Sequence, residues 1–478
     1  MQNASEVVVQ APGTEILTER ETGELVELLQ GLLRIKSVNP PGDEILAARF
    51  LEGVLAAEGM VANVIEPFPG RASILARVHG DGSGGDPLLL LSHLDVVPAE
   101  PAGWSHDPFG GDLADGYVWG RGAMDMKSMV SMEVQVMRRL ARRAREAGLD
   151  PAVDPIPGLR RDVVFCSSAD EEAGGWHGAD WIVREHPEWL RAAAAINEAG
   201  AIATTYGGVR FYPIQVAEKG FVVYKLHVNG HWGHGSVPTP DNAAVLAAQI
   251  VTRVAEPGPV RLTEAMATAL TRALPHMAAR AAQTIGALIA DPAGVQAVDI
   301  DRALRNLCDP VLARTISAVI RDTASVGIVS SGVKYNVIPG TAEIVIDCRI
   351  LPGTDEPAMR AELRRRIGEE LWARMDVECE QTGTSIQAPL DNPLYAILEQ
   401  VLRDHDPEGV PVPFLAPFST DAKHLARIGV PTYGFSPLRV GPGDGLLELM
   451  HADNERVSVE ALRFGLPALW DAVIRFCN

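Results

Sequence analysis

Cysteine is scarce in this chain and never occurs in a paired spacing. Five cysteines are spread over 478 residues, and none belongs to a C-x-x-C pattern. Their positions are Cys166, Cys308, Cys348, Cys379 and Cys477. A disulfide framework and a thiolate zinc site are therefore not indicated, and a reducing compartment fits this usage best.

Basic residues are also few. The sequence has 42 Lys and Arg against 62 Asp and Glu, which gives a formal net charge of −20. It contains no basic stripe, and we therefore expect no nucleic-acid partner.

Long apolar runs are missing as well. No segment has membrane length, and the first residues are mixed and acidic instead of having the basic start and apolar core of a signal peptide. We expect a soluble cytoplasmic protein with no membrane partner. Because 478 residues exceed the usual size of one core, we also expect two domains.

The sequence does contain short, continuous apolar runs that predict buried strands. They are PLLLLSHLD (87–95), DVVFCSSADEE (162–172), AAAAINEAG (192–200) and VPTYGFS (430–436). Each of these segments except the last leads directly into His or carboxylate residues. Helical patterns such as 23–35 and 44–60 lie between the segments. This alternation predicts an α/β fold with a mostly parallel sheet flanked by helices. Its ligand site should lie at the carboxyl ends of the strands.

A different pattern begins near residue 218. Residues 220–230 alternate apolar and polar side chains, as a half-exposed strand does, and helices and strands follow in a βαββαβ order. We predict a small α+β domain over 218–383, inserted into a catalytic domain formed by 1–217 and 384–478. An Ala- and Leu-rich stretch at 256–322 predicts an extra helical insertion within the small domain.

The candidate functional residues are histidines and carboxylates. They are His93, Asp95, Asp125, Glu171, Glu172, Glu198 and His451. Nitrogen and oxygen donors without thiolate are typical of catalytic zinc, cobalt or manganese, and a bridging carboxylate can hold two such ions about 3.5–4 Å apart. Residues 93 and 95 share one face of a strand, so Asp95 can hold the ring nitrogen of His93 that does not bind metal. Of the adjacent Glu171 and Glu172, one can bind metal while the other serves as general base.

Each of these residues also has an ordinary structural explanation. A histidine at a strand end is usually hydrogen-bonded within the fold, and an Asp-Glu-Glu triplet usually marks a solvated loop or a helix start. His451 alone fits a surface residue. The functional interpretation is favoured because several buried strands end in ligand-type residues on one rim of the same sheet.

A series of motifs over nearly the whole chain resembles the dinuclear metallohydrolase family of aminoacylase, acetylornithine deacetylase, succinyl-diaminopimelate desuccinylase, carboxypeptidase G and dipeptidases. The motifs are SVNPPGDE (37–44), LLLLSHLDVVPA (88–99), WSHDPFGG (104–111), VWGRGAMDMKSMV (118–130), SADEEAGGWHG (168–178), INEAG (196–200), GHGSVPTPDNA (233–243), NVIPGTAEIVIDCRILPG (336–353) and MHADNERV (450–457). Their order and spacing make the combination far more specific than any one motif.

The resemblance implies a ligand set. Asp125 would bridge two metal ions, His93 and Glu198 would complete one site, and Glu172 and His451 the other. The ions would be zinc, with cobalt or manganese as alternatives.

The resemblance also implies roles outside the ligand set. Glu171 would be the general base, and Asp95 would orient the first histidine. The small domain would act as a lid and dimerisation domain, in which His234 reaches across a dimer to stabilise the developing oxyanion. Asn336 and Arg349 match lid positions that contact the carboxylate end of the substrate. Without the resemblance, His234 fits a turn residue and Arg349 a surface charge.

Together these features predict a metal-dependent hydrolase of an amide bond in N-acyl amino acids or small peptides with a free carboxylate. A bridging water would be activated by two metals, with Glu171 moving its proton to the leaving nitrogen. An aminopeptidase or dipeptidase that recognises a free amine is the nearest alternative. A non-catalytic relative is disfavoured because no ligand or base is missing. An oxidoreductase is disfavoured because GRGAMD (120–125) lacks the spaced glycines of a dinucleotide turn.

Overall fold

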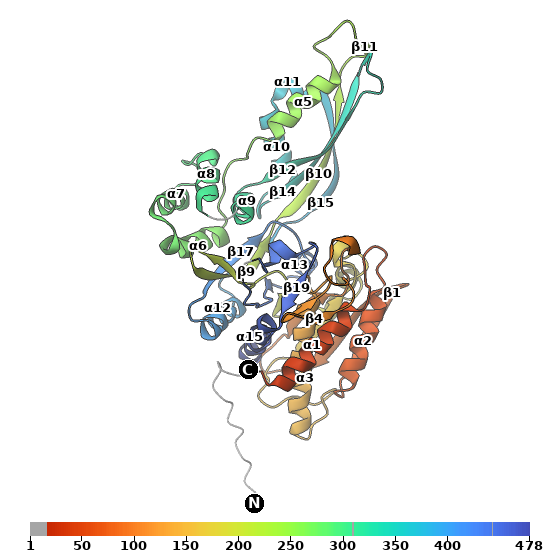
Figure 1. Cartoon of the computed structure of the whole chain (residues 1–478), viewed down its shortest axis with the longest axis vertical. Helices are drawn as coiled ribbons and strands as arrows, with labels where there is room; N and C mark the ends of the chain where they lie inside the picture. Colours follow the sequence, from red (N-terminus) through yellow and green to blue (C-terminus); the bar gives the residue numbers. More distant parts are fainter. Residues whose placement is uncertain (1–16, 308–309, 442) are drawn as a thin grey trace, which may run out of the picture. The chain divides into compact units, whose positions relative to one another are not determined.

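The computed structural model describes residues 17–307, 310–441 and 443–478. The chain divides into two compact units. Unit 1 contains the chain up to Gln215 together with Pro389–Val412 and His424–Asn478, and unit 2 contains Val216–Ala388 and Pro413–Lys423. Figure 1 shows the elements of both units.

Unit 1 is built around a mixed sheet with the strand order β1-β2-β6-β3-β7-β18-β9. The four central strands β6, β3, β7 and β18 pair in parallel, whereas β1, β2 and β9 pair antiparallel at the sides. Their bounds are Ala62–Phe68 (β1), Arg71–Val78 (β2), Leu88–His93 (β3), Val163–Ser168 (β6), Ala194–Asn197 (β7), Val209–Glu218 (β9) and Thr432–Gly434 (β18). The predicted α/β fold with a mostly parallel sheet is confirmed.

The central strands consist of continuous apolar runs because helices cover both of their faces. On one face, Leu89, Leu91 and Val164 pack against Ile182 and Val183 of α4. On the other, α3 contacts β2, β3 and β6, and α1 and α15 pack on α3. The helices of unit 1 are α1 (Glu19–Leu33), α2 (Glu44–Ala56), α3 (Lys127–Glu146), α4 (Ala179–Glu185), α12 (Pro393–His405), α14 (Leu446–Leu449) and α15 (Val459–Cys477).

Short strands complete the description. Unit 1 also contains a three-stranded sheet of β4 (Asp112–Ala114), β5 (Tyr117–Trp119) and β19 (Arg456–Ser458), and β8 (Thr204–Tyr206) pairs with β9. Three further short elements are not confined to unit 1: β16 (Ile386–Gln387) belongs to unit 2, and β17 (Val410–Ala416) and α13 (Ala422–Ala426) have residues in both units. None of the helices in the described part of the chain has the length and apolar character needed to cross a bilayer.

Unit 2 has its own antiparallel sheet, in the order β12-β14-β10-β15. The strands are β12 (Thr323–Ser331), β14 (Thr341–Ile350), β10 (Gly220–Asn229) and β15 (Met375–Gly383). Every second residue of β10 is buried, from Val222 to Val228, and these side chains pack against α5 (Ala243–Val254) and α10 (Glu356–Ile367). This separate sheet fits an inserted α+β domain. The short helix α11 (Glu369–Trp372) and the strand pair β11 (Gly233–His234) and β13 (Val337–Ile338) belong to the same unit.

In the described part of the chain, four further helices lie between α5 and β12, and Figure 1 shows them grouped together. They are α6 (Glu264–Ala273), α7 (Ala279–Ala290), α8 (Ala297–Leu307) and α9 (Pro310–Val319). The chain enters and leaves this helical insertion at neighbouring points, where Val260 forms an antiparallel bridge with Arg321. The buried ammonium of Lys219 donates hydrogen bonds to the carbonyl oxygens of Ala318 and Arg321, at 2.9 Å each.

An ion pair holds the insertion to its return point. Asp301 of α8 accepts hydrogen bonds from Nη1 and Nη2 of Arg321 at 3.1 and 2.8 Å, and from the hydroxyl of Ser317 at 2.8 Å. The Arg321 side chain is only 4% exposed. Removing one partner of such a buried pair leaves the other charge uncompensated, at a cost of about 3–5 kcal/mol.

We therefore expect Asp301→Ala to loosen the insertion locally. Limited proteolysis, with the cut sites mapped by mass spectrometry, should show cleavage between residues 264 and 319 about tenfold faster or more than in the wild type. Asp299→Ala is the matched control, because Asp299 lies on the same helix in an exposed pair with Arg302 and should have little effect. Equal cleavage of both variants would contradict this role of the ion pair.

Candidate metal centre

The five predicted ligands lie close together in unit 1. His93 ends β3, and Glu198 directly follows β7. Glu172 belongs to the short 3-10 helix Glu171–Ala173 that follows β6, and Asp125 precedes α3. Parallel strands bring their carboxyl ends to one edge of the sheet, and the loops that follow them supply the side chains.

These residues form two groups that share Asp125. His93, Asp125 and Glu198 offer ligand atoms within 4.8 Å of one another, and so do Asp125, Glu172 and His451. The two oxygens of the shared carboxylate face different histidines. Oδ1 lies 3.2 Å from His93 Nε2, and Oδ2 lies 3.2 Å from His451 Nε2. One carboxylate is therefore placed to serve both groups.

The site concentrates negative charge, and the pKa values of its members respond to this. Burial, with the charges of Asp125 and Glu172, raises the pKa of Glu198 to about 7. Burial and the charge of Asp125 raise the pKa of Glu172. Hydrogen bonds with Asp125 and Glu172 raise the pKa of His451 to about 10. Burial alone would lower the pKa of His93, but the neighbouring carboxylates outweigh it and raise the value. The carboxylates thus favour positive charge beside them, as a cation site does.

The donor set fits divalent metal ions. It consists of imidazole nitrogens and carboxylate oxygens, the set that zinc, cobalt and manganese accept. Glu172 Oε1 is buried and has no hydrogen-bond partner among the residues that the structure describes. A buried carboxylate oxygen without a partner is costly in a protein that binds nothing there, whereas metal coordination would satisfy it.

Asp95 is fully buried beside the group. His93 Nδ1 lies 3.0 Å from the backbone carbonyl of Asp95 and 3.5 Å from its carboxylate. Because a carbonyl only accepts, Nδ1 carries the proton and Nε2 remains as the ligand atom. The carboxylate of Asp95 accepts hydrogen bonds from the backbone N–H groups of Glu171 and Glu172 at 3.1 Å each. It therefore holds the turn that carries both glutamates, a function that the H-x-D spacing did not predict.

Sequence reasoning missed Glu455. Its fully buried carboxylate accepts hydrogen bonds from Arg121 Nη1 (2.6 Å) and from the backbone N–H groups of Gly122 (3.1 Å), Met124 (2.7 Å) and Asp125 (3.0 Å). It links the segment after His451 to the loop that presents the shared aspartate. It lies within the MHADNERV motif (450–457), but its spacing alone suggested no function for it.

A second buried set surrounds Asp170 and was also missed. The Asp170 carboxylate accepts hydrogen bonds from Asn39 Nδ2 (3.0 Å) and Arg71 Nη2 (2.7 Å). Asn39 also donates to Asp95 at 2.8 Å, and Arg71 forms a bidentate pair with Glu44. These partners lie more than 90 positions from Asp170 in the sequence, which explains why spacing could not connect them.

The three remaining predicted residues belong to unit 2. His234 lies on β11, is exposed, and accepts a hydrogen bond at Nδ1 from the Ser236 backbone N–H at 3.2 Å. Asn336 lies beside His234, because the backbone carbonyl of Asn336 accepts a hydrogen bond from the Gly235 N–H at 2.9 Å. Arg349 is on β14, where Asp347 holds its guanidinium at 2.9–3.2 Å.

His234 and Arg349 lie at opposite ends of the unit-2 sheet. Asn229, which ends β10 shortly before β11, pairs with Thr341, whereas Arg349 pairs with Phe221 at the start of β10. The eight residue steps from Thr341 to Arg349 span about 26 Å at about 3.3 Å per residue. One small ligand cannot touch both ends of the same sheet.

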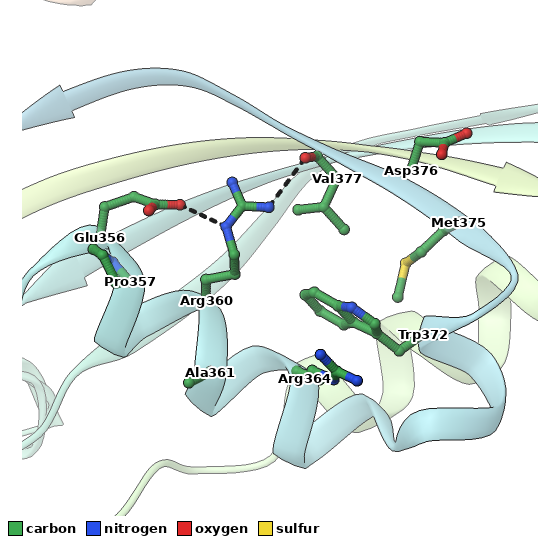
Figure 2. A pocket seen from close by; sticks show the side chains of 9 residues that line it. All are labelled: Glu356, Pro357, Arg360, Ala361, Arg364, Trp372, Met375, Asp376 and Val377. Carbon is green, nitrogen blue, oxygen red and sulfur yellow. Dashed lines mark hydrogen bonds and ion pairs between the residues drawn. The ribbon is translucent and has the colours of Figure 1, made fainter.

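A pocket with a volume of about 440 Å³ also lies in unit 2, between α10 and β15. Figure 2 shows Arg360, Arg364 and Trp372 among its lining residues. Arg360 is paired with Glu356 and with the carbonyl of Val377, and Arg364 is paired with Glu369. None of the predicted site residues lines this pocket.

Comparisons with known proteins identify the family of this chain. The sequence pattern of peptidase family M20/M25/M40 matches residues 89–474. The chain is 27% identical over 465 residues to N-fatty-acyl-amino acid synthase/hydrolase PM20D1 of Xenopus tropicalis, covering 93% of this chain and 84% of that protein. It is 26% identical over 441 residues to aminoacylase-1 of Sus scrofa, covering 90% of each.

A solved structure shares the fold. The M20 family metallo-carboxypeptidase Sso-CP2 of Sulfolobus solfataricus superposes with a TM-score of 0.66 at 16% identity, over 96% of this chain and 99% of that one. The match to the family covers well over half of the chain. This chain belongs to peptidase family M20/M25/M40, and it is a metallohydrolase of the kind that acts on amide or peptide bonds.

Proposed function

We propose that this protein hydrolyses the amide bond of N-acyl amino acids or of small peptides that carry a free carboxylate. The observation that carries the proposal is the shared carboxylate of Asp125, whose two oxygens face His93 and His451 within two groups of nitrogen and oxygen donors. The similarity of this chain to an aminoacylase and to an N-fatty-acyl-amino acid synthase/hydrolase supports the proposed substrate class.

In this proposal two divalent ions share the centre. Asp125 serves both, His93 and Glu198 complete one ligand set, and Glu172 and His451 the other. We propose zinc, and cobalt and manganese accept the same donors. When bound, such ions lower the pKa of water and polarise a carbonyl oxygen.

Glu171 is the proposed general base. Its backbone N–H is held by Asp95, and it stands next to a proposed ligand in a turn fixed by the same carboxylate. A carboxylate in this position can take the proton of the attacking water and return it to the leaving nitrogen, a contribution of about 10²–10⁴-fold in rate.

His234 is the proposed donor to the oxyanion. Because Nδ1 accepts the Ser236 N–H, the ring proton of the neutral imidazole is at Nε2, which can donate to a developing negative charge. Since one ligand cannot reach both ends of the unit-2 sheet, we propose that His234 and Asn336 come from one subunit of a homodimer and Arg349 from the other.

The edge strand β12 supports the proposed dimer. It has no charged residue from Thr323 to Val333, and Ile328 and Val329 are 55% and 53% exposed. Soluble proteins usually protect a free edge strand with charges or proline. A second copy of β12 related by a two-fold axis could pair with this edge.

The shared ligand leads to a prediction about metal content. Asp125→Ala should retain fewer ions per chain than His451→Ala, because Asp125 belongs to both ligand groups and His451 to one. Elemental analysis after dialysis against buffered zinc measures this, with His79→Ala as a control that should match the wild type. Equal metal content in the Asp125 and His451 variants would rule out the shared role.

The proposed dimer can be tested by complementation. Glu171→Gln and His234→Ala should each be nearly inactive alone. In a mixed dimer, the site with an intact Glu171 would receive an intact His234 from the other subunit. Co-expression in equal amounts should then restore about a quarter of the wild-type activity, since about half of the dimers are mixed and each has one complete site. A mixture as inactive as its components would show that His234 acts within its own subunit.

The substrate class can be tested with an N-acetyl amino acid, its C-terminal amide and the matching free-amine dipeptide. The wild type should prefer the N-acetyl acid. Arg349→Lys should reduce kcat/KM for the acid about 30-fold or more relative to the amide, because losing the bidentate contact to a desolvated carboxylate costs about 2–5 kcal/mol.

Arg360→Lys is the matched control for this test. Its side chain is 35% exposed and paired with Glu356, similar to the 38% exposed Arg349 and its partner Asp347. It should leave the preference unchanged. A wild-type preference for the free-amine dipeptide would favour the aminopeptidase or dipeptidase alternative.

A further inference from the structure

An exposed tryptophan lies four positions after Glu172 and has no part in the ligand set. Trp176 lies in the segment 174–178 that follows Glu171 and Glu172, and it is 60% exposed. Single exposed apolar residues are common on proteins, so the surroundings decide whether this one has a function.

The backbone around Trp176 is fixed. The Gly174 N–H donates to the Glu171 carbonyl at 2.9 Å, and the Gly175 N–H donates to the Asp170 carbonyl at 2.6 Å. The Gly174 carbonyl accepts a hydrogen bond from the buried His424 Nε2 at 3.0 Å. Gly174 and Gly175 have φ values of 108° and 78°, which only glycine adopts without strain. A large aromatic side chain is therefore presented on a well-held turn.

The indole lies over the end of the turn that carries the proposed ligand and base. A Cβ placed on Gly174 would come within 2.7 Å of Trp176 Nε1, and Gly174 is two positions from Glu172. The indole is also 6.4 Å from the His424 ring. On the other side, His177 packs against Phe68, which is 39% exposed. Trp176 and Phe68 thus give this part of the rim an apolar character.

The charge nearby selects what can bind to this rim. Glu171, which lies outside the proposed ligand set, disfavours a further carboxylate at this turn, so the carboxylate end of a substrate is an unsuitable partner for the indole. An aromatic face of this size is suited to an alkyl chain.

We propose that Trp176 is a specificity-determining residue that packs against an apolar chain of the substrate. The inference rests on the proposed amide hydrolysis. The chain has two sources, the acyl group and the side chain of the amino acid, and the experiment separates them.

The test compares zinc-loaded wild type, Trp176→Ala and Trp176→Phe on two substrate series. One series varies the acyl group from acetyl to octanoyl on a fixed amino acid, and the other varies the side chain of an N-acetyl amino acid from Ala to Leu and Phe. For the wild type, kcat/KM should rise by up to about fourfold per methylene that reaches the indole. Trp176→Ala should lose about tenfold or more on the longest members and less than about threefold on the shortest.

In one of the two series, kcat/KM of Trp176→Ala should no longer rise with the size of the apolar group. That series identifies whether the acyl group or the amino acid side chain contacts the indole. Trp176→Phe should keep most of the slope because it retains an aromatic face, and Leu46→Ala, an exposed apolar residue of α2, should behave as the wild type. Inhibition by acetate and octanoate gives a second measurement. If the chain is the acyl group, only octanoate should lose affinity in Trp176→Ala.

Two results would overturn the inference. The first is unchanged slopes in both series together with unchanged octanoate inhibition. The second is a Trp176→Ala loss confined to the free-amine dipeptide of the substrate-class test, assayed alongside the two series, which would indicate a cation over the indole. If the wild type hydrolyses no member of either series, the proposed function itself fails, and this outcome is distinct from both.

Discussion

The arrangement of unit 1 depends on one electrostatic constraint. The Asp125 carboxylate is held within a few ångströms of the carboxylates of Glu172 and Glu198, and Asp125 and Glu198 are buried. Carboxylates in such a place repel each other strongly, and they remain ionised only with positive charge between them. The carboxylates lie close together in spite of this repulsion because the parallel strands end at one edge of the sheet, where several loops converge. The histidines complete the ligand set, and no sulfur ligand is present in it. Such a set is more typical of a catalytic metal ion that polarises an oxygen atom than of a purely structural metal ion.

Buried carboxylates outside the ligand set keep the centre in place. Asp95 holds the turn of Glu171 and Glu172, and Glu455 holds the loop of Asp125. Each does so by accepting backbone N–H groups, so it fixes the course of the chain as well as one side chain. Charge-assisted hydrogen bonds of this kind are stronger than neutral ones, and they limit how far the ligands can drift.

Much of unit 1 could be predicted from the sequence because its signals are local. The apolar runs that end at His93 and Asn197 are continuous and bounded by polar residues, so their strands and their functional ends could be recognised together. Glu455 and Asn39 lie within the MHADNERV and SVNPPGDE motifs, but their functions could not be found this way because their partners are distant in sequence. In unit 2 the alternating β10 was evident, whereas the edge strand β12 could be placed only by its order in the pattern.

The bridge between Val260 and Arg321 has an evolutionary consequence. The four described helices between these residues form a side branch that begins and ends at one point of unit 2. Joining the two ends by a short turn would change the loop-closure entropy only slightly, and the pairing of β12 with β14 would keep its register. This branch can therefore grow, shrink or disappear among homologues while the hydrolytic machinery stays constant, and differences in chain length within the lineage should accumulate here first.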